Sequence, residues 1–153
     1  LFSKVNINLI FLRVILSVMG DISTIDKSLR ILIIDDDGPT RKLIKLTLKA
    51  LGFKNIIEAA NGMDGLMRLR MDESVKLVIC DWRMPELVGI EVLREIREDE
   101  HYQDLPFLML TSETKKEQVL EAIELKVSDY MAKPVTYAGL REKLENLLGD
   151  KER

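Results

Sequence analysis

The sequence predicts one doubly wound α/β domain, in which a parallel sheet of five strands is covered on both faces by five helices. The first observation is a regular alternation, from residue 29 onward, between short apolar runs and longer segments with helical spacing. The second is the length of 153 residues with 46% hydrophobic and 32% charged residues, which is typical of one globular domain. The third is that this region contains no internal repeat, low-complexity tract or linker.

The five predicted strands are short apolar runs of the kind that is buried on both faces of a parallel sheet. They lie at Leu29–Ile34, Asn55–Glu58, Val75–Cys80, Phe107–Leu110 and Ser128–Ala132. Because each run is separated from the next by a helical segment, neighbouring strands are expected to be parallel.

The five predicted helices lie at Pro39–Leu51, Asn61–Arg70, Gly89–Glu98, Glu113–Leu125 and Thr136–Leu148. A proline near the first turn and Gly52 just after the end delimit the first of them. Asn61 and Thr136 are residue types that favour the N-cap position. Four methionines are interpreted as packing positions: Met63, Met67, Met71 and Met109.

Residues 1–28 are expected to be an extension that precedes the domain at residues 29–149, with a short tail at residues 150–153. The extension carries an apolar run from Leu9 to Met19 that Arg13 interrupts. A membrane span needs about 20 apolar residues, and no small-residue cleavage site follows the run. We interpret residues 1–18 as an over-extended start or as an arm outside the domain. A membrane or export role, a packing arm and an oligomer contact remain alternatives.

Composition argues against several classes of function. The formal net charge is -3 with acidic and basic residues spread along the chain, which disfavours nucleic-acid binding. The single cysteine, Cys80, rules out a disulfide framework and fits a reducing compartment. Since no convincing export signal or membrane span is found either, we expect a cytoplasmic protein without membrane insertion. The single histidine, His101, excludes zinc sites that need clustered cysteine and histidine ligands.

Polar side chains gather at the carboxyl ends of the predicted strands, where doubly wound sheets bind their ligands. The acidic run Asp35–Asp37 follows the first strand and Asp81 follows the third. Thr111 and Ser112 follow the fourth strand, and Lys133 follows the fifth. Each residue alone is an ordinary turn residue, but together they predict carboxylates, a hydroxyl and an ammonium at one rim. Clustered carboxylates need a cation, and an all-oxygen set of ligands favours Mg²⁺.

A carboxylate beside a hard cation, a lysine and a hydroxyl can accept a phosphoryl group. Asp81 is the best candidate for the nucleophile because it follows a strand that is expected to be central. The acidic run after the first strand would instead hold the metal. The sequence contains no P-loop, glycine-rich dinucleotide turn or nucleophile elbow that would indicate nucleotide or acyl chemistry.

Five motifs in register resemble the receiver domain of two-component response regulators. They are Asp35-Asp36, Asp81-Trp82-Arg83-Met84-Pro85, Gly89, Thr111-Ser112 and Tyr130-Met131-Ala132-Lys133-Pro134. The resemblance covers residues 29 to about 149 and is strongest to the chemotaxis (CheY-like) type, through residues 51–56 and 81–85. It implies the strand order 2-1-3-4-5, for which flavodoxin and CheY are standard examples.

The resemblance also implies a chemical role for each matched residue. Asp81 would take a phosphoryl group from the phosphohistidine of a histidine kinase, and Lys133 would pair with that group. Asp36 and Asp81 would bind Mg²⁺ directly, together with the backbone carbonyl of Arg83, while Asp35 would act largely through a water molecule.

A conformational switch is implied as well. Thr111 would bond to a phosphoryl oxygen and move inward, and Tyr130 would rotate into the vacated space. This would repack the surface formed by the last two helices and the last strand, to which a downstream protein such as the flagellar motor switch would bind. Pro134 would shape the following loop, with a cis Lys133–Pro134 bond.

We therefore expect a stand-alone receiver that acts as a phosphoacceptor switch in chemotaxis and not as a turnover enzyme. Val135 stands where chemotaxis regulators commonly carry phenylalanine, so a phosphorelay or another regulatory receiver is the alternative. An aspartate-nucleophile phosphatase of the haloacid dehalogenase type needs D-x-D-x-[TV], and Asp35–Pro39 fails at the last position. A flavin-binding electron carrier shares the fold, but no hydroxyl-rich loop follows the first strand.

Overall fold

The computed structural model describes residues 9–11, 22–112 and 115–149. Its elements follow in the order η1 (Ile22–Thr24), β1 (Arg30–Ile34), α2 (Gly38–Ala50), β2 (Asn55–Ala59), α3 (Gly62–Met71), β3 (Val75–Asp81), α4 (Gly89–Glu98), β4 (Phe107–Thr111), α5 (Lys116–Glu124), β5 (Asp129–Ala132) and α6 (Tyr137–Leu148). The five strands form one parallel sheet in the order β2-β1-β3-β4-β5, which confirms the predicted fold class and strand order.

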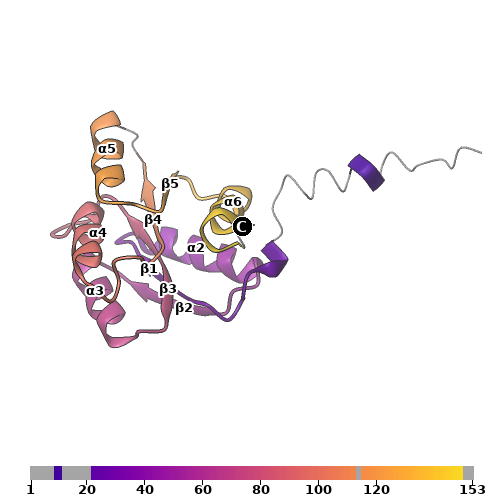
Figure 1. Ribbon diagram of the computed structural model, residues 1–153, viewed down its shortest axis with the longest axis horizontal. Coiled ribbons are helices and arrows are strands. Elements are labelled where there is room, and N and C mark those ends of the chain that lie inside the picture. Colours follow the sequence, from indigo (N-terminus) through magenta and orange to yellow (C-terminus); the bar gives the residue numbers. More distant parts are fainter. Residues whose placement is uncertain (1–8, 12–21, 113–114, 150–153) are drawn as a thin grey trace, which may run out of the picture.

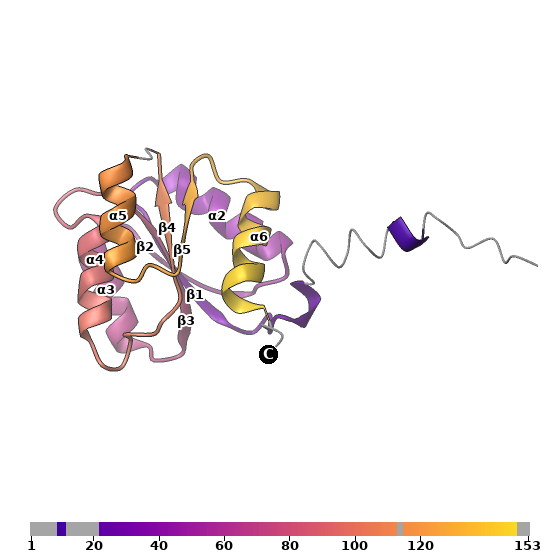
Figure 2. The same cartoon turned by 45° about the horizontal axis from the view of Figure 1, so that its top comes forward.

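The sheet is the middle layer of three. Helices α3, α4 and α5 cover one face, and α2 and α6 cover the other (Figures 1 and 2). Because side chains of a strand alternate between faces, the apolar residues of β1 serve both layers. Leu32 and Ile34 join the hydrophobic cluster beneath α3, α4 and α5, while Ile31 and Ile33 join the cluster beneath α2 and α6. A strand that is apolar at every position is therefore buried on both faces.

Three helices, α2, α3 and α6, begin directly after a capping residue. Asn61 and Thr136 each accept a hydrogen bond from the backbone N–H three residues later, at 2.8 and 3.1 Å. Asp37 does the same for α2 at 2.9 Å, so this helix begins one residue before the predicted proline. Gly52 has a φ of 99° just beyond the end of α2, a conformation that glycine adopts without strain. The helix predicted from residue 113 begins at Lys116, and residues 113–114 lie outside those described.

The interpretation of three α3 methionines as packing positions is wrong. Their exposed fractions are 60% for Met63, 54% for Met67 and 80% for Met71. The face of α3 that meets the sheet instead carries two glycines and two leucines: Gly62, Gly65, Leu66 and Leu69. At Gly65 an added Cβ would lie 2.4 Å from Ile34 Cδ1, so a larger residue here would displace the Ile34 side chain. Met109, in contrast, is fully buried in β4 as predicted.

The segment before β1 packs onto the domain from residue 22 onward. Ile25 is buried in the cluster beneath α2 and α6, and the Lys27 ammonium lies 4.7 Å from the centre of the Phe53 ring. The remaining residues of the predicted extension, apart from residues 9–11, lie outside those described. No helix within the described ranges has the length and apolar character that a membrane crossing requires.

Candidate functional site

The carboxyl ends of four parallel strands bring the predicted site residues to one edge of the sheet. Asp35 directly follows β1, and Asp81 is the last residue of β3. Thr111 is the last residue of β4, and Lys133 directly follows β5. Because parallel strands all end at the same edge, residues 98 positions apart in the sequence lie in contact here.

The Lys133 ammonium joins the two buried carboxylates of this edge. Lys133 Nζ donates to Asp35 Oδ2 at 2.9 Å and lies 3.0 Å from Asp81 Oδ1. Asp35 is fully buried and Asp81 is 6% exposed, whereas Asp36 is exposed. The ammonium therefore bridges the two buried carboxylates.

Local hydrogen bonds orient Asp35. Its Oδ1 accepts from the backbone N–H of Asp37 at 2.8 Å, and its own N–H donates to the carbonyl of Ala59 at 3.2 Å. Arg41 Nη1 donates to the carbonyl oxygen of Asp35 at 2.7 Å. Sequence reasoning missed this contribution of Arg41, because an arginine in the first turn of a helix looks the same whether it is solvated or bonded to a nearby carbonyl.

Asp81 is positioned by the close approach of α4. The Gly89 N–H donates to the Trp82 carbonyl at 2.8 Å, and the Trp82 N–H donates to the Leu110 carbonyl at 2.8 Å. A Cβ at Gly89 would lie 2.2 Å from the carbonyl oxygen of Asp81. Sequence reasoning matched Gly89 as part of a motif but missed this packing role. Between these residues, Glu86 has a φ of 68°, the left-handed conformation that glycine favours.

Burial and neighbouring charges shift the pKa values of Asp81 and Lys133. Burial, and next the negative charge of Asp35, raise the pKa of Asp81 above its ordinary value, although Lys133 opposes the shift. Burial disfavours a charged Lys133, but its hydrogen bonds to Asp35 and Asp81 outweigh burial and raise its pKa. Lys133 therefore carries its full charge at neutral pH, and Asp81 is a more basic carboxylate than a solvated aspartate.

The acidic cluster fits a hard divalent cation. Carboxylate oxygens of Asp35, Asp36 and Asp81 lie within 4.8 Å of one another. Three carboxylates beside one ammonium leave an excess of negative charge, and oxygen is the ligand that Mg²⁺ prefers. These three residues could therefore hold Mg²⁺. Arg83 lies two residues beyond β3 and is exposed, and the part of its carbonyl in a metal site remains a prediction.

Thr111 and Tyr130 both line one small cavity. Thr111 is buried, and its backbone carbonyl accepts from the Lys133 N–H at 2.8 Å. Both residues line a cavity of about 10 Å³ together with Trp82, Met109 and residues of α5. The Tyr130 side chain is also partly exposed, with the Lys143 ammonium 6.0 Å from its ring centre. The Lys133–Pro134 peptide bond is cis, as expected.

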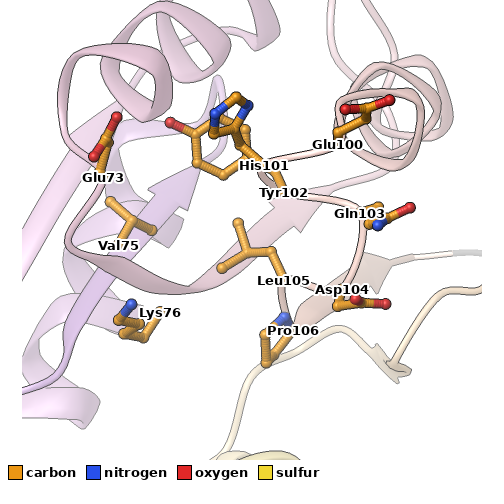
Figure 3. A pocket seen from close by; sticks show the side chains of 10 residues that line it. All are labelled: Glu73, Val75, Lys76, Glu100, His101, Tyr102, Gln103, Asp104, Leu105 and Pro106. Atoms are coloured by element: carbon orange, nitrogen blue, oxygen red, sulfur yellow. The ribbon is translucent and has the colours of Figure 1, made fainter.

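A larger cavity lies at the opposite end of the sheet. It measures about 400 Å³ and is lined by Glu73, Val75, Lys76 and residues 100–106 (Figure 3). Val75 begins β3, and Pro106 directly precedes β4, so this cavity faces the amino ends of the strands. His101 is exposed at its edge, with its Nδ1 3.4 Å from Asp99 Oδ1. None of the predicted site residues lines this cavity.

Comparisons with known proteins agree with this geometry. Residues 31–145 match the response regulator receiver domain. A chemotaxis protein CheY homolog of Campylobacter jejuni is 39% identical over 121 residues, which are 79% of this chain and 93% of the relative. Chemotaxis protein CheY-3 of Vibrio cholerae is 42% identical over 123 residues, 80% of this chain and 94% of the relative.

A solved structure gives the same result. Chemotaxis protein CheY4 of Vibrio cholerae superposes with a TM-score of 0.74 at 27% identity, covering 79% of this chain and 99% of that chain. The fold, the acidic rim with its bridging lysine and the sequence match thus agree over the same residues. The chain belongs to the response regulator receiver domain family, and its relatives include CheY chemotaxis proteins of two-component signalling.

Proposed function

We propose that Asp81 accepts a phosphoryl group from the phosphohistidine of a histidine kinase in a Mg²⁺-dependent reaction. The observation that carries this proposal is the Lys133 ammonium, which contacts both Asp35 and Asp81 at 2.9 and 3.0 Å. The Asp81 carboxylate lies next to the Lys133 ammonium and to the carboxylates of Asp35 and Asp36, which could bind a metal ion, and this arrangement suits a phosphoacceptor. The carboxylate is nucleophilic, and the charge of the transferred group is offset where it arrives.

The transfer exchanges one bond to phosphorus for another. A carboxylate oxygen of Asp81 attacks phosphorus, and the bond between phosphorus and the imidazole nitrogen of the kinase breaks. The imidazole nitrogen keeps the electron pair and takes a proton. Lys133 then pairs with the phosphoryl oxygens, and the Thr111 hydroxyl donates a hydrogen bond to one of them. Asp35, Asp36 and Asp81 would hold Mg²⁺, and the cation would supply further positive charge beside the transferred group.

The phosphorylated state is proposed to switch the surface formed by α5, β5 and α6. Movement of Thr111 toward the phosphoryl group would enlarge the cavity of about 10 Å³ that it shares with Tyr130. The present cavity has room for little more than one water molecule, so the Tyr130 ring cannot enter it. Once the cavity is enlarged, the partly exposed ring could rotate inward. One added charge would thus bias a two-state element that a downstream protein reads.

The downstream role is proposed to be chemotaxis in the cytoplasm. The relatives named above are chemotaxis proteins, and the flagellar motor switch is the partner this implies. Val135, where chemotaxis regulators commonly carry phenylalanine, keeps another phosphorelay partner as the alternative. Stronger binding of the phosphorylated chain than of the unphosphorylated chain to an isolated motor-switch peptide would support the chemotaxis role. Equal binding of the two forms would reject that role.

Intact mass spectrometry tests the acceptor directly. The protein is incubated with acetyl phosphate, with Mg²⁺ or with EDTA, and compared with Asp81→Asn. Asp104→Asn is the matched control, since this carboxylate lines the cavity at the other end of the sheet. We expect one phosphoryl group on the wild type and on Asp104→Asn, and none on Asp81→Asn or without Mg²⁺. Equal modification of Asp81→Asn, or no modification by acetyl phosphate and by a phosphorylated histidine kinase, would reject the proposal.

A further inference from the structure

Helix α3 carries an apolar stripe that no described part of the chain covers. The methionine stripe consists of Met63, Met67 and Met71, which recur every four residues and so lie along one side of the helix. All three are more than half exposed. Helix α3 lies on the outside of the domain, so its outer side is accessible (Figures 1 and 2). Flexible thioether side chains of this kind are common in surfaces that bind another protein.

The charges beside the stripe are balanced. By helical spacing, Asp64 and Arg68 lie on one side of it, and Arg70 lies on the other. Arg68 Nε donates to Asp64 Oδ2 at 2.9 Å, and Arg70 Nη2 donates to Glu95 Oε2 of α4 at 3.2 Å. A surface with both signs on its border and no net charge fits a partner with the same balanced pattern, and not a strongly acidic or basic one.

The stripe is complementary to a reversed copy of itself. A twofold axis through Met67 exchanges Met63 of one copy with Met71 of the other. Such an axis places the side of the stripe with Asp64 and Arg68 next to the same side of the second copy. Asp64 would therefore lie about 3 Å along the helix axis from Arg68 of the second copy, and Arg68 likewise from its Asp64, within reach of an arginine side chain. In a parallel twofold arrangement the border with Asp64 and Arg68 would instead face the border with Arg70, which brings Arg68 close to Arg70 of the second copy. The charges therefore favour the antiparallel arrangement.

We propose that the methionine stripe is the contact between two copies of this chain, packed antiparallel around Met67. Few residues take part, whereas stable interfaces use roughly 20–30 residues a side. The dimer is therefore weak and forms only at high concentration. Its contact residues are all on α3, so this inference does not depend on phosphorylation of Asp81 and survives if that proposal fails.

Sedimentation velocity of the full chain tests the contact over a concentration range of about 10 μM to 1 mM, which brackets a weak interface. We expect the weight-average sedimentation coefficient of the wild type to rise with concentration and that of Met67→Asp to stay monomeric. Leu46→Asp on α2 is the matched control, because Leu46 and Met67 are both 54% exposed. A wild type that is monomeric throughout, or a Met67→Asp variant that associates like the wild type, would overturn the proposal.

Charge reversal tests the antiparallel orientation. Asp64→Lys makes one border of the stripe wholly basic, and Arg68→Glu makes it wholly acidic. Each variant alone should associate about fivefold more weakly, since two exposed ion pairs are lost. An equimolar mixture should recover wild-type association. Both variants lack the ion pair within their own helix, so recovery can come only from pairing between chains. A mixture that associates no better than either variant alone would refute the orientation.

Discussion

Replacing Gly89 by alanine puts one methyl group into the backbone that carries Asp81. The added Cβ would lie 2.2 Å from the Asp81 carbonyl oxygen and 3.0 Å from Met109 Sδ. Non-bonded heavy atoms are most stable at about 3.5 Å or more, so one side has to move by roughly 1 Å. Strand β3 cannot recede, because it is paired with β1 on one side and β4 on the other. The first turn of α4 must therefore move outward.

The cost follows from what α4 packs and bonds. Ile90, Val92, Leu93 and Ile96 are buried in the core beneath this helix. Overfilling a packed core costs about 1–3 kcal/mol. Loss of the 2.8 Å hydrogen bond from the Gly89 N–H adds about 1 kcal/mol. The helical preference of alanine returns somewhat less than 1 kcal/mol. We expect Gly89→Ala to lower the free energy of unfolding by about 2–3 kcal/mol.

Urea unfolding followed by far-UV circular dichroism measures this loss, with two other glycines as graded controls. A Cβ at Gly65 would lie 2.4 Å from Ile34 Cδ1, the end of a flexible side chain, so Gly65→Ala should cost about 1–2 kcal/mol. A Cβ at Gly38 would meet only the Arg41 side chain, at 3.8 Å. Gly38→Ala should therefore be neutral or stabilise the protein by up to about 1 kcal/mol.

The order of the three variants decides whether the reasoning holds. A Gly89→Ala protein within about 0.5 kcal/mol of the wild type would mean that α4 moves aside freely. Equal losses at Gly38 and Gly89 would mean that backbone preference, and not contact with Asp81, sets the cost. Either result would refute the claim that this glycine is required by the close approach of α4 to the strand end.

Three further predictions concern charge and capping. Because the pKa of Asp81 is raised in the folded protein, its ionisation should lower the free energy of unfolding as pH rises from the ordinary aspartate pKa through the raised one. In EDTA, Asp81→Asn should remove this pH dependence and be more stable than the wild type at pH 7, and an unchanged pH profile of unfolding would contradict the prediction. Lys133→Gln leaves two buried carboxylates without their cation, so unfolding experiments should show a loss of about 3 kcal/mol, which a result near zero would disprove. Thr136→Ala should cost about 1 kcal/mol in the same assay while Thr136→Ser keeps the α6 cap, and equal effects would argue against the cap.

Most of the fold could be predicted because the apolar runs that form strands and the capping residues that begin helices are both local in the sequence. The runs that became β1 and β3 are apolar at nearly every position, which predicts burial on both faces. Caps such as Asn61 fix where helices begin, since their hydrogen bonds span only three residues. The exposed stripe of α3 could not be predicted. Two sides of that helix are apolar. Which of them packs against the sheet depends on the contact between Gly65 and Ile34, which are distant in the sequence.

The site could be predicted as far as strand ends determine it. The rule that parallel strands end at one edge was enough to bring Asp35, Asp81 and Lys133 together. It could not indicate that Arg41 bonds to the Asp35 carbonyl, because a long side chain in a helix can reach several acceptors or none. Nor could it indicate the close contact at Gly89, which depends on the angle at which α4 meets β3.

The strand order also has a consequence for how the chain folds. Every pair of neighbouring strands is parallel, so no strand can pair with its neighbour through a short turn. Strand β1 pairs with both β2 and β3, so the chain segments between these strands must close before either pair of strands can form hydrogen bonds. Such long-range contacts slow folding relative to helical bundles of similar size. During synthesis, β1 leaves the ribosome first but stays unpaired on its second side until β3 follows, and its four consecutive isoleucine and leucine residues are exposed for that time.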